Sequence, residues 1–566
     1  MKKLLTVLVI LFMLVGCGGG SSDSAQSDAE VLKEATIQVP ADIMSMDPQI
    51  ATDGQSFSAQ NLCFAGLTQL DADGNPVPDV AESWTISDDG CVYTFKLRDT
   101  KWSNGDKVTA NDFVYAWQRL TTPETASDYN WLLETANVVN SDCYDPESGH
   151  TPQDLGVKAI DDNTLEVTLS QPTGFFLQIV SFPSTFPLNQ KFYESVGDQY
   201  ALKIDNILFN GPYVMTSWDG GYGYSFRLNP DYFDYNNYVG KYADKLNFRI
   251  VADTQSALMD YESGNLDYVA LNGAQVKANE KKDGFTARLG SYNFYLILNI
   301  NYLAKDANPA TSNLNVRKAM SYAIDREDVC NTLNDGSIAS AGIVPFKLAA
   351  NPETGADFRD DAGNLLAFDQ AKAKEYYEAA KAELGQDQIS IKLMYSSDQG
   401  DPEIVSATRI AAQLEEVGFA VELDPQPKKS RLNVYQHVNV EDQAGNKLAV
   451  EDRTADFEAS LTRWGPDYGD PQTYMDLFWS SNYSNNNGGY MSEAYDAAMT
   501  VAEAAGTTPI DRWNKFIEAE KVLISEDYGV VPVFQNGGAC LINPKISGIE
   551  FHSASVDVFR HIVVNK

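Results

Sequence analysis

An aromatic and acidic segment is the part of the sequence whose residue types best suit chemistry on a ligand. It consists of Trp464-Gly465-Pro466-Asp467-Tyr468-Gly469-Asp470-Pro471. Its glycines and prolines favour an irregular loop over a helix or a strand. We expect the aromatic rings to form flat apolar walls with an acid between them, which suits a ligand that carries an amine beside an apolar body.

The same segment is equally compatible with a purely structural role. In that alternative Trp464 lies in the core, and Asp467 and Asp470 cap the backbone amides of a turn. The spacing of the residues favours neither alternative.

Familiar catalytic and metal-binding patterns are absent from the sequence. There is no G-x-S-x-G, H-E-x-x-H or G-x-x-x-x-G-K-[ST] motif, and no G-x-G-x-x-G that opens a helix. The four histidines, His150, His437, His552 and His561, have no ligand-like spacing. We therefore expect no catalytic residue, no histidine-based metal site and no cofactor. The 79 acidic residues leave open a cation held by carboxylates and an acid-pair hydrolase.

The length and the charge of the chain exclude further classes of protein and partner. A chain of 566 residues is expected to form two or three domains, and a content of 43% hydrophobic and 11% aromatic residues indicates a globular protein. The net charge of −37 argues against nucleic acid as a partner, because phosphates would be repelled. It also disfavours a basic surface that lies on anionic lipid.

The N-terminal residues have the pattern of an export signal. Lys2 and Lys3 precede an apolar run, Leu4–Val15, which is too short to span a membrane comfortably. The run ends in Leu14-Val15-Gly16-Cys17, which resembles a bacterial lipobox, and this implies that the Cys17 thiol carries a lipid. An ordinary signal peptide and a short anchor helix are the alternatives.

We therefore expect a lipoprotein signal peptide over residues 1–17. Residues 18–35 begin with a run rich in glycine, serine and aspartate and are expected to form a flexible tether. The protein would then be held at the extracytoplasmic face of a membrane, on a Gram-positive cell or in a periplasm.

Disulfide bonds are not expected to hold the fold together. Five cysteines would remain after removal of the signal: Cys63, Cys91, Cys143, Cys330 and Cys540. An odd number leaves at least one free thiol in a monomer, and a chain of this length can bury a large core without such bonds.

Hydrophobic periodicity predicts a mixed α/β protein. A strand at 389–395, a helix over 404–414 that ends at Gly418, and a strand at 419–423 form a βαβ unit with parallel strands. A hairpin is expected over 157–169, after a strand at 91–97. Further elements are expected at 112–120, 316–323 and 369–384, all helices, and at 457–461, a strand directly before Trp464.

Across nearly the whole mature chain, a set of short motifs resembles the peptide-binding lipoproteins of ABC importers, in particular the oligopeptide-binding proteins of solute-binding protein family 5. These motifs occur in the expected order and at the expected spacing. They are Met46-Asp47-Pro48-Gln49, Gly66-Leu67, Gly74-Asn75-Pro76, Ala81-Glu82-Ser83-Trp84, Tyr93-Thr94-Phe95-Lys96-Leu97-Arg98, Lys101-Trp102-Ser103-Asn104-Gly105, the segments 108–120 and 155–162, Asn210-Gly211-Pro212-Tyr213, Val316-Arg317-Lys318-Ala319, Ala323-Ile324-Asp325-Arg326-Glu327 and Val531-Pro532-Val533-Phe534.

The resemblance implies a two-lobed fold, like that of periplasmic binding proteins, with an extra domain in the first lobe and a ligand cleft between the lobes. The first lobe would be discontinuous and the second lobe an insertion. The implied boundaries are 36–63, 190–290 and 535–566 for lobe one, 64–189 for its extra domain and 291–534 for lobe two.

The resemblance also implies residues of a peptide site. The first aspartate of the W-x-x-D-Y segment, Asp467, would pair with the α-ammonium group of the peptide. Trp464 would pack on the ligand, and Tyr129 and Tyr468 would line the site. The sequence departs from the family pattern at Leu461, which replaces an arginine, at Gln535-Asn536, which replaces tyrosines, and in an apparent insertion from about Asn439 to Arg453.

The resulting hypothesis is a lipid-anchored monomer that captures oligopeptides and delivers them to ABC transporter permease subunits. Three alternatives remain. These are a receptor for one signalling peptide, a binder of nickel, haem or a sugar on the same scaffold, and an acid-pair hydrolase.

Overall fold

The computed structural model describes residues 32–300, 309–399, 401–435, 457–480, 489–504, 507–552 and 556–565. The expected signal peptide, the lipidation site Cys17 and the expected insertion at 439–453 lie outside the described residues. Within the described residues, no helix combines the length and the apolar character that a membrane crossing needs.

A mixed sheet of eleven strands runs through the described chain. Ten strands follow one another along it, and β13 (Ile338–Ala339) pairs with β17 beside this path. The order is β15 (Ala420–Gln426), β14 (Ser390–Ser396), β16 (Ala459–Trp464), β12 (Phe285–Leu298), β17 (Val530–Ile542), β11 (Tyr268–Leu271), β1 (Glu34–Val39), β10 (Lys245–Ile250), β9 (Gly223–Leu228) and β8 (Tyr213–Asp219).

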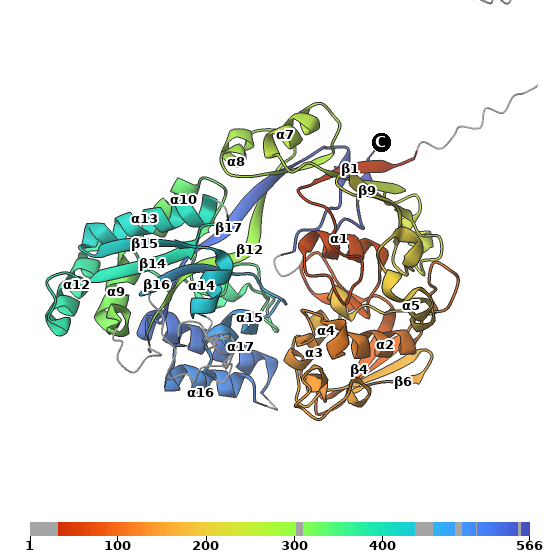
Figure 1. Cartoon of the computed structure of the whole chain (residues 1–566), viewed down its shortest axis with the longest axis horizontal. Coiled ribbons are helices and arrows are strands. Elements are labelled where there is room, and N and C mark those ends of the chain that lie inside the picture. Colours follow the sequence, from red (N-terminus) through yellow and green to blue (C-terminus); the bar gives the residue numbers. More distant parts are fainter. Residues whose placement is uncertain are drawn as a thin grey trace, which may run out of the picture. The chain divides into compact units, whose positions relative to one another are not determined.

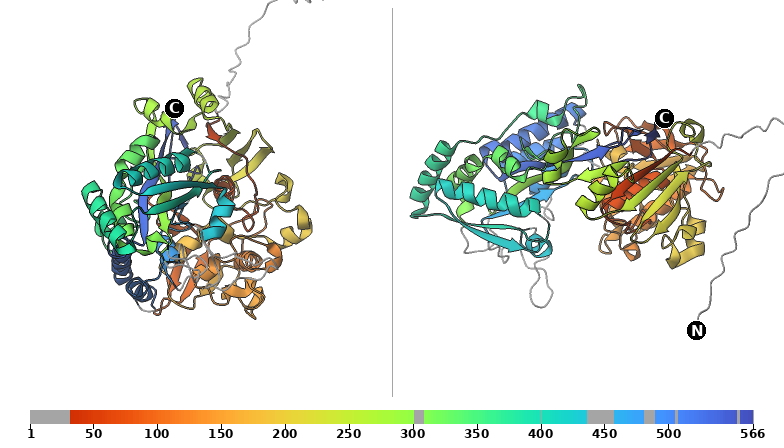
Figure 2. Two further views of the ribbon diagram at one scale, coloured as in Figure 1. Left: turned by 60° about the vertical axis from the view of Figure 1, so that its left-hand side comes forward. Right: turned by 90° about the horizontal axis from the view of Figure 1, so that it is seen from above.

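The long strands β12 and β17 belong to both halves of this sheet. They lie side by side, as the green and blue strands of Figures 1 and 2 show, and are antiparallel. One end of the pair continues to β11 and β1, and the other continues to β16 and β14. The register between β12 and β17 shifts between Leu289 and Asn293, so the ladder is irregular where the halves meet.

Two groups of hydrophobic cores divide the chain into two lobes. The first group draws its buried residues from 35–276 and 539–562, and the second draws them from 294–534. One residue crosses this division, because Tyr468 packs in the core of the first lobe.

The second lobe has helices on both faces of its sheet because alternate residues of β12 point to opposite sides. Phe294 and Leu296 face a core that contains α9 (Leu314–Ala323), α12 (Gln370–Leu384) and α13 (Asp401–Val417). Tyr295 and Ile297 face the opposite core, which contains α16 (Glu493–Ala502) and α17 (Pro509–Lys521). In Figure 1, α13 lies above β14 and β16, and α16 and α17 lie below them.

The predicted βαβ unit is confirmed. β14 and β15 are parallel, and α13 connects them. Ala407, Ala411 and Leu414 are buried on the sheet side of the helix, whereas Ile404 near its start is exposed. The helix ends at Gly418, whose φ of +130° an L-residue rarely adopts.

The predicted helices are also confirmed, with ends that their caps explain. α2 (Ala110–Leu120) begins two residues earlier than expected because Thr109 and Asp112 form a capping box. The Asn313 side chain caps α9, and the Asp369 side chain caps α12.

The hairpin and the strand before it form a separate small sheet in the first lobe. The hairpin strands are β6 (Val157–Asp161) and β7 (Thr164–Thr168). The four-stranded sheet has the order β4 (Ala81–Ile86), β5 (Val92–Leu97), β7, β6.

The expected end of the tether at residue 35 is wrong. β1 already begins at Glu34, and Ala35 is fully buried where β1 pairs in parallel with β10. Glu34 and Ala35, which follow a polar run and are expected in the tether, therefore belong to β1 instead. All five cysteines of the described chain are free.

Substituting Gly537 should destabilise the protein through the strands shared by the lobes. A Cβ at Gly537 would collide with the backbone of Gly336, whereas a Cβ at the adjacent Gly538 would meet nothing within 4 Å. We expect Gly537→Ala to lower the free energy of unfolding by about 1–3 kcal/mol, as overpacking does. Gly538→Ala, the matched control, should leave it unchanged or slightly higher. Equal urea denaturation midpoints for the two variants would contradict this.

Candidate ligand-binding site

The aromatic and acidic segment begins at the last residue of strand β16, which determines its position. The strand extends to Trp464, which is paired with Asn293 of β12, so Trp464 ends a strand rather than lying in a loop as expected. The loop proper follows, and Pro471 leads into the short helix α15 (Gln472–Met475). The half-buried indole of Trp464 donates its Nε1–H to the hydroxyl of Thr473 over 3.3 Å.

The two aspartates of the loop have different environments. Asp470 accepts hydrogen bonds from the backbone N–H of Gln472 at 2.9 Å and from both Nη atoms of Arg512 at 2.7 and 2.9 Å. Asp467 has one hydrogen bond within the described chain, from its own backbone N–H to Thr473 Oγ1. The capping alternative therefore holds for Asp470, and the carboxylate of Asp467 remains available to a ligand.

Burial raises the pKa of Asp467 from its ordinary value to about 6. No neighbouring cation or hydrogen-bond donor among the described residues offsets this effect. A carboxylate kept out of water without a partner is a strong site for a cation or an ammonium group, because the ligand supplies the missing charge.

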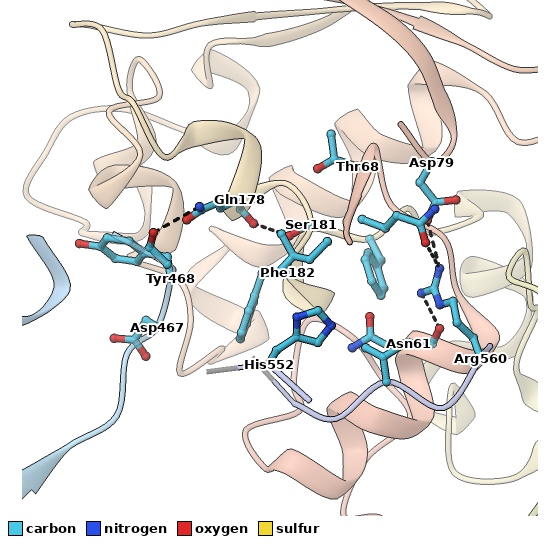
Figure 3. Close-up of a pocket in the computed structure, with 15 residues that line it drawn as sticks. Asn61, Thr68, Asp79, Gln178, Ser181, Phe182, Asp467, Tyr468, His552 and Arg560 are labelled. Carbon is cyan, nitrogen blue, oxygen red and sulfur yellow. Dashed lines mark hydrogen bonds and ion pairs between the residues drawn. The ribbon is translucent and has the colours of Figure 1, made fainter. Parts of the chain in front are cut away.

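Asp467 lies between two cavities. The larger one, about 260 Å³, is lined by residues of the second lobe that include Tyr292, Arg463 and Trp464. The smaller one, about 30 Å³, is lined by Tyr468 and Gly469 of the same loop and mostly by residues of the first lobe. Figure 3 shows Asp467 and Tyr468 at one side of this smaller cavity.

Tyr129 of the first lobe lies near Asp467. Its ring contacts Phe182, which lines the smaller cavity, with centroids 4.9 Å apart. Burial raises the pKa of Tyr129 well above its ordinary range, and the charge of Asp467 raises it further. Tyr129 and Asp467 are far apart in the sequence and belong to different lobes, and the structure brings them together.

Tyr468 connects the loop to the first lobe. Its ring is 5% exposed and stacks on Phe175, with centroids 4.3 Å apart and an angle of 11° between the planes. Burial raises the pKa of Tyr468 well above its ordinary range. This geometry makes the ring a fixed wall beside Asp467.

Three further residues hold the loop, and sequence reasoning missed them. Arg512 of α17 binds Asp470 and Glu503, and its guanidinium lies 5.7 Å from the ring centre of Phe175. Gln178 of the first lobe donates its amide N–H to the backbone oxygen of Gly469 over 3.3 Å. Phe175, Gln178 and Arg512 belong to no motif, so only the folded chain reveals them.

One departure from the family pattern, Gln535, proves to be structural, and so does the motif residue before it, Phe534. Phe534 stacks on Phe294 in the second core, with ring centroids 4.2 Å apart. Gln535 bridges the backbone of Gly290 and Phe346, at the irregular part of the β12–β17 ladder. No group of three or more candidate metal ligands occurs within the part of the chain that the structure describes.

A family model described as "Bacterial extracellular solute-binding proteins, family 5 Middle" matches residues 75–486. The chain belongs to this family. Family 5 consists of solute-binding proteins rather than enzymes. The resemblance of the sequence motifs to this family is therefore confirmed.

Individual relatives are similar to this chain over almost their entire length. A dipeptide-binding protein of Lactococcus lactis is 33% identical over 562 residues, which cover 96% of this chain and 95% of that protein. The structure of Listeria monocytogenes OppA bound to peptide is 30% identical, with a TM-score of 0.72 and coverage of 95% and 100%. The pheromone receptor PrgZ has the same identity, TM-score and coverage.

The stability of this family 5 protein without ligand should depend on pH through Asp467. The folded state holds the proton of Asp467 more tightly than the unfolded state, so the free energy of unfolding falls as pH rises from about 4 to about 6. Asp467→Asn lacks this titration and should therefore melt higher than the wild type at pH 7, but not at pH 4.

Thermal melting of ligand-free protein across this pH range tests the expectation. Asp128→Asn, the same change at an exposed site, serves as the matched control and should track the wild type. A difference between Asp467→Asn and the wild type that stays constant with pH would contradict the desolvation of this carboxylate.

Proposed function

We propose that this protein captures oligopeptides between its two lobes and delivers them to the permease of an ABC transporter, with no catalysis of its own. The observation that carries the proposal is the desolvated carboxylate of Asp467, which lies between two cavities and has no partner among the described residues. The peptide-binding relatives support the same ligand class.

Asp467 is proposed to bind the α-ammonium group of the peptide. Both groups lose water on binding, and each supplies the charge that the other then needs. Tyr468 and Trp464 border the carboxylate as aromatic walls, and Tyr129 approaches it from the other lobe. A peptide held in this way presents one invariant group, its amino terminus, so recognition does not require a particular sequence.

The larger cavity is proposed to receive the peptide backbone. Its volume of about 260 Å³ is close to the lower end of the range for small-molecule sites. Main-chain hydrogen bonds to an extended peptide would give affinity without dependence on side chains.

The lobes are proposed to move about the strands that they share. We assign 36–63, 190–290 and 535–566 to lobe one, 64–189 to its extra domain and 291–534 to lobe two. The register shift in the β12–β17 ladder and the separate cores on either side of it support these boundaries. Hinge closure would then bring Tyr129 and Asp467 onto the same ligand.

Attachment to the membrane is proposed to occur through lipid on Cys17, with the protein a monomer on the extracytoplasmic side. The lipobox-like sequence 14–17 and the extracytoplasmic family support this assignment. A tether after Cys17 would keep the lobes near the permease and free to turn.

A second candidate function is the capture of one signalling peptide. The similarity to the pheromone receptor PrgZ favours it. Ligand breadth separates the two functions. Native mass spectrometry of protein lacking residues 1–17, purified without refolding, should reveal a ladder of mixed peptides for an importer and one sharp adduct for a dedicated receptor.

Removing the carboxylate of Asp467 should abolish tight peptide binding. The loss of one partner from a buried ion pair costs about 3–5 kcal/mol, which corresponds to a several-hundred-fold weaker affinity or more. We expect Asp467→Ala to show this loss in calorimetric titration with a peptide that binds the wild type. Acetylation of the peptide's amino terminus should weaken binding to the wild type by a similar factor.

Asp476→Asn is the matched control, since it changes a buried aspartate nine residues further on. Burial raises the pKa of Asp476 to about 8, so this side chain is largely neutral at pH 7, as asparagine is. Its affinity for peptide should equal that of the wild type. Retained affinity in Asp467→Ala would refute the assignment of the ammonium partner.

Peptide affinity should also fall in acid. Only ionised Asp467 pairs with an ammonium group, and burial sets the pKa of the free protein at about 6. Below that pH, the dissociation constant should rise by about tenfold per pH unit, since each binding event must first remove a proton. Titrations between pH 7.5 and pH 5 measure this effect, and a constant affinity over that range would contradict it.

A further inference from the structure

A single turn of helix in the first lobe contacts the aromatic and acidic loop. This turn is α4 (Phe176–Ile179), and Phe175 directly precedes it. Phe175 and Gln178 are three residues apart, so their side chains lie on the same face of the turn. Phe175 stacks on Tyr468, and Gln178 donates a hydrogen bond to the backbone oxygen of Gly469. Two first-lobe side chains thus contact two consecutive residues of the loop.

The ring of Tyr468 crosses from one lobe into the other. Its loop leaves the second lobe at Trp464 and returns to it at α15, so both ends of the loop belong to that lobe. The ring nevertheless packs in the core of the first lobe, where it is 5% exposed and Phe175 is 2% exposed. Moving the ring away from Phe175 would expose both rings to water, which costs free energy in proportion to their apolar area.

The part of the first lobe that receives this ring is firmly packed. Phe176, next to Phe175, is fully buried, and its ring lies 4.6 Å from that of Tyr93 in the four-stranded sheet. On the second-lobe side, the guanidinium of Arg512 lies 5.7 Å from the ring centre of Phe175 and is itself bound to Asp470. Phe175 is therefore held by its own lobe and contacts two side chains of the other lobe.

These contacts lie away from the strands that the lobes share. In Figure 1, α4 and α15 lie on the facing sides of the two lobes, below β12 and β17. A hinge movement about β12 and β17 would separate Tyr468 from Phe175 and break the hydrogen bond of Gln178. Each contact joins protein groups only, so the lobes are connected here before any ligand arrives.

We propose that the ring of Tyr468 and its first-lobe partners, Phe175 and Gln178, form an interlobe lock that is released whenever a peptide enters or leaves the site. This inference rests on the proposed capture of peptides between moving lobes. Phe175 and Gln178 are positioning residues in this lock, since they act on the ligand only through Tyr468 and Gly469.

The lock should control the rates of peptide exchange rather than the affinity. Asp467 directly precedes Tyr468, so an ammonium group binds the carboxylate while the ring stays on Phe175. The lock is then closed both in the free protein and in the complex. An interaction that is equal in the two end states cancels from the equilibrium. It is lost only in the open state between them, so it slows entry and exit alike.

Weakening the lock should therefore accelerate entry and exit by the same factor. Phe175→Leu keeps an apolar side chain but removes the stacked ring, and an aromatic pair of this kind is worth up to about tenfold in an equilibrium. For an alanine peptide that binds the wild type, we expect the association and dissociation rate constants both to rise by about three- to tenfold, with Kd changed by about twofold or less. Stopped-flow fluorescence measures both rates, because Trp464 lines the larger cavity.

Phe176→Leu, the same change one residue further on, is the matched control. Its ring packs within the first lobe, so this variant should melt lower but exchange peptide at the wild-type rates. Gln178→Ala removes only the hydrogen bond to Gly469 and should raise both rate constants by a smaller factor than Phe175→Leu. Wild-type rates in Phe175→Leu, or a loss of affinity with an unchanged association rate, would overturn the lock.

The distance between the lobes tests the lock without a ligand. Spin labels at Asp88→Cys in the first lobe and Lys374→Cys in the second, both exposed positions, report this distance once the half-buried Cys91 and Cys330 are replaced by serine. Electron resonance should give one narrow distance distribution for the labelled, ligand-free protein, and Tyr468→Ala should broaden it. A broad distribution with Tyr468 present, or a narrow one in Tyr468→Ala, would contradict the lock.

The outcomes separate this inference from the proposed function. If no peptide binds the wild type, the peptide-binding function is refuted together with the role of the lock in exchange, while the label distances still decide whether the contact holds the lobes. If peptides bind but Phe175→Leu exchanges them at the wild-type rates, the lock is refuted and the function stands. The distance distribution with Tyr468 present decides the matter even if a Phe175 variant does not fold.

Discussion

The rest of the site depends on the desolvation of one carboxylate, that of Asp467. A buried charge without a partner is unfavourable, so other contacts must hold it in place. Arg512 fixes the loop through Asp470, and Tyr468 fixes it through the core of the other lobe. The carboxylate of Asp467 is thus held between Asp470 and Tyr468, whose own contacts offset the cost of its desolvation.

The residues on either side of Asp467 belong to different lobes. Trp464 lies on a strand of the second lobe's part of the central sheet, whereas Tyr468, four residues later, packs in the core of the first lobe. The loop between them therefore passes from one lobe to the other. An ammonium group bound at Asp467 would be in contact with both lobes from the start, which couples ligand binding directly to the arrangement of the lobes.

Local parts of the fold could be predicted from the sequence because their signals are local. The helix at 404–414 and the strands around it show the two periodicities side by side, and capping residues such as Asp369 mark helix ends. The strand expected at 457–461 is observed as β16, which begins and ends later, at Ala459 and Trp464, because its pairing with β12 extends to Trp464. The motif around Asp467 points to this residue as a ligand-binding candidate. The partners that hold its loop, such as Gln178, come from distant segments without any pattern, and only tertiary contacts bring them there.

The two strands shared by the lobes are also where the chain enters and leaves the second lobe. Asn293 on β12 lies opposite Gln535 on β17, so the second lobe begins and ends about one strand spacing apart, roughly 5 Å. The second lobe is therefore an insertion that is connected to the first lobe at one pair of neighbouring strand positions. Its two ends are close enough to be joined by a short turn. An isolated second lobe, or a permuted chain that starts within it, would therefore keep every strand pairing that lies within that lobe.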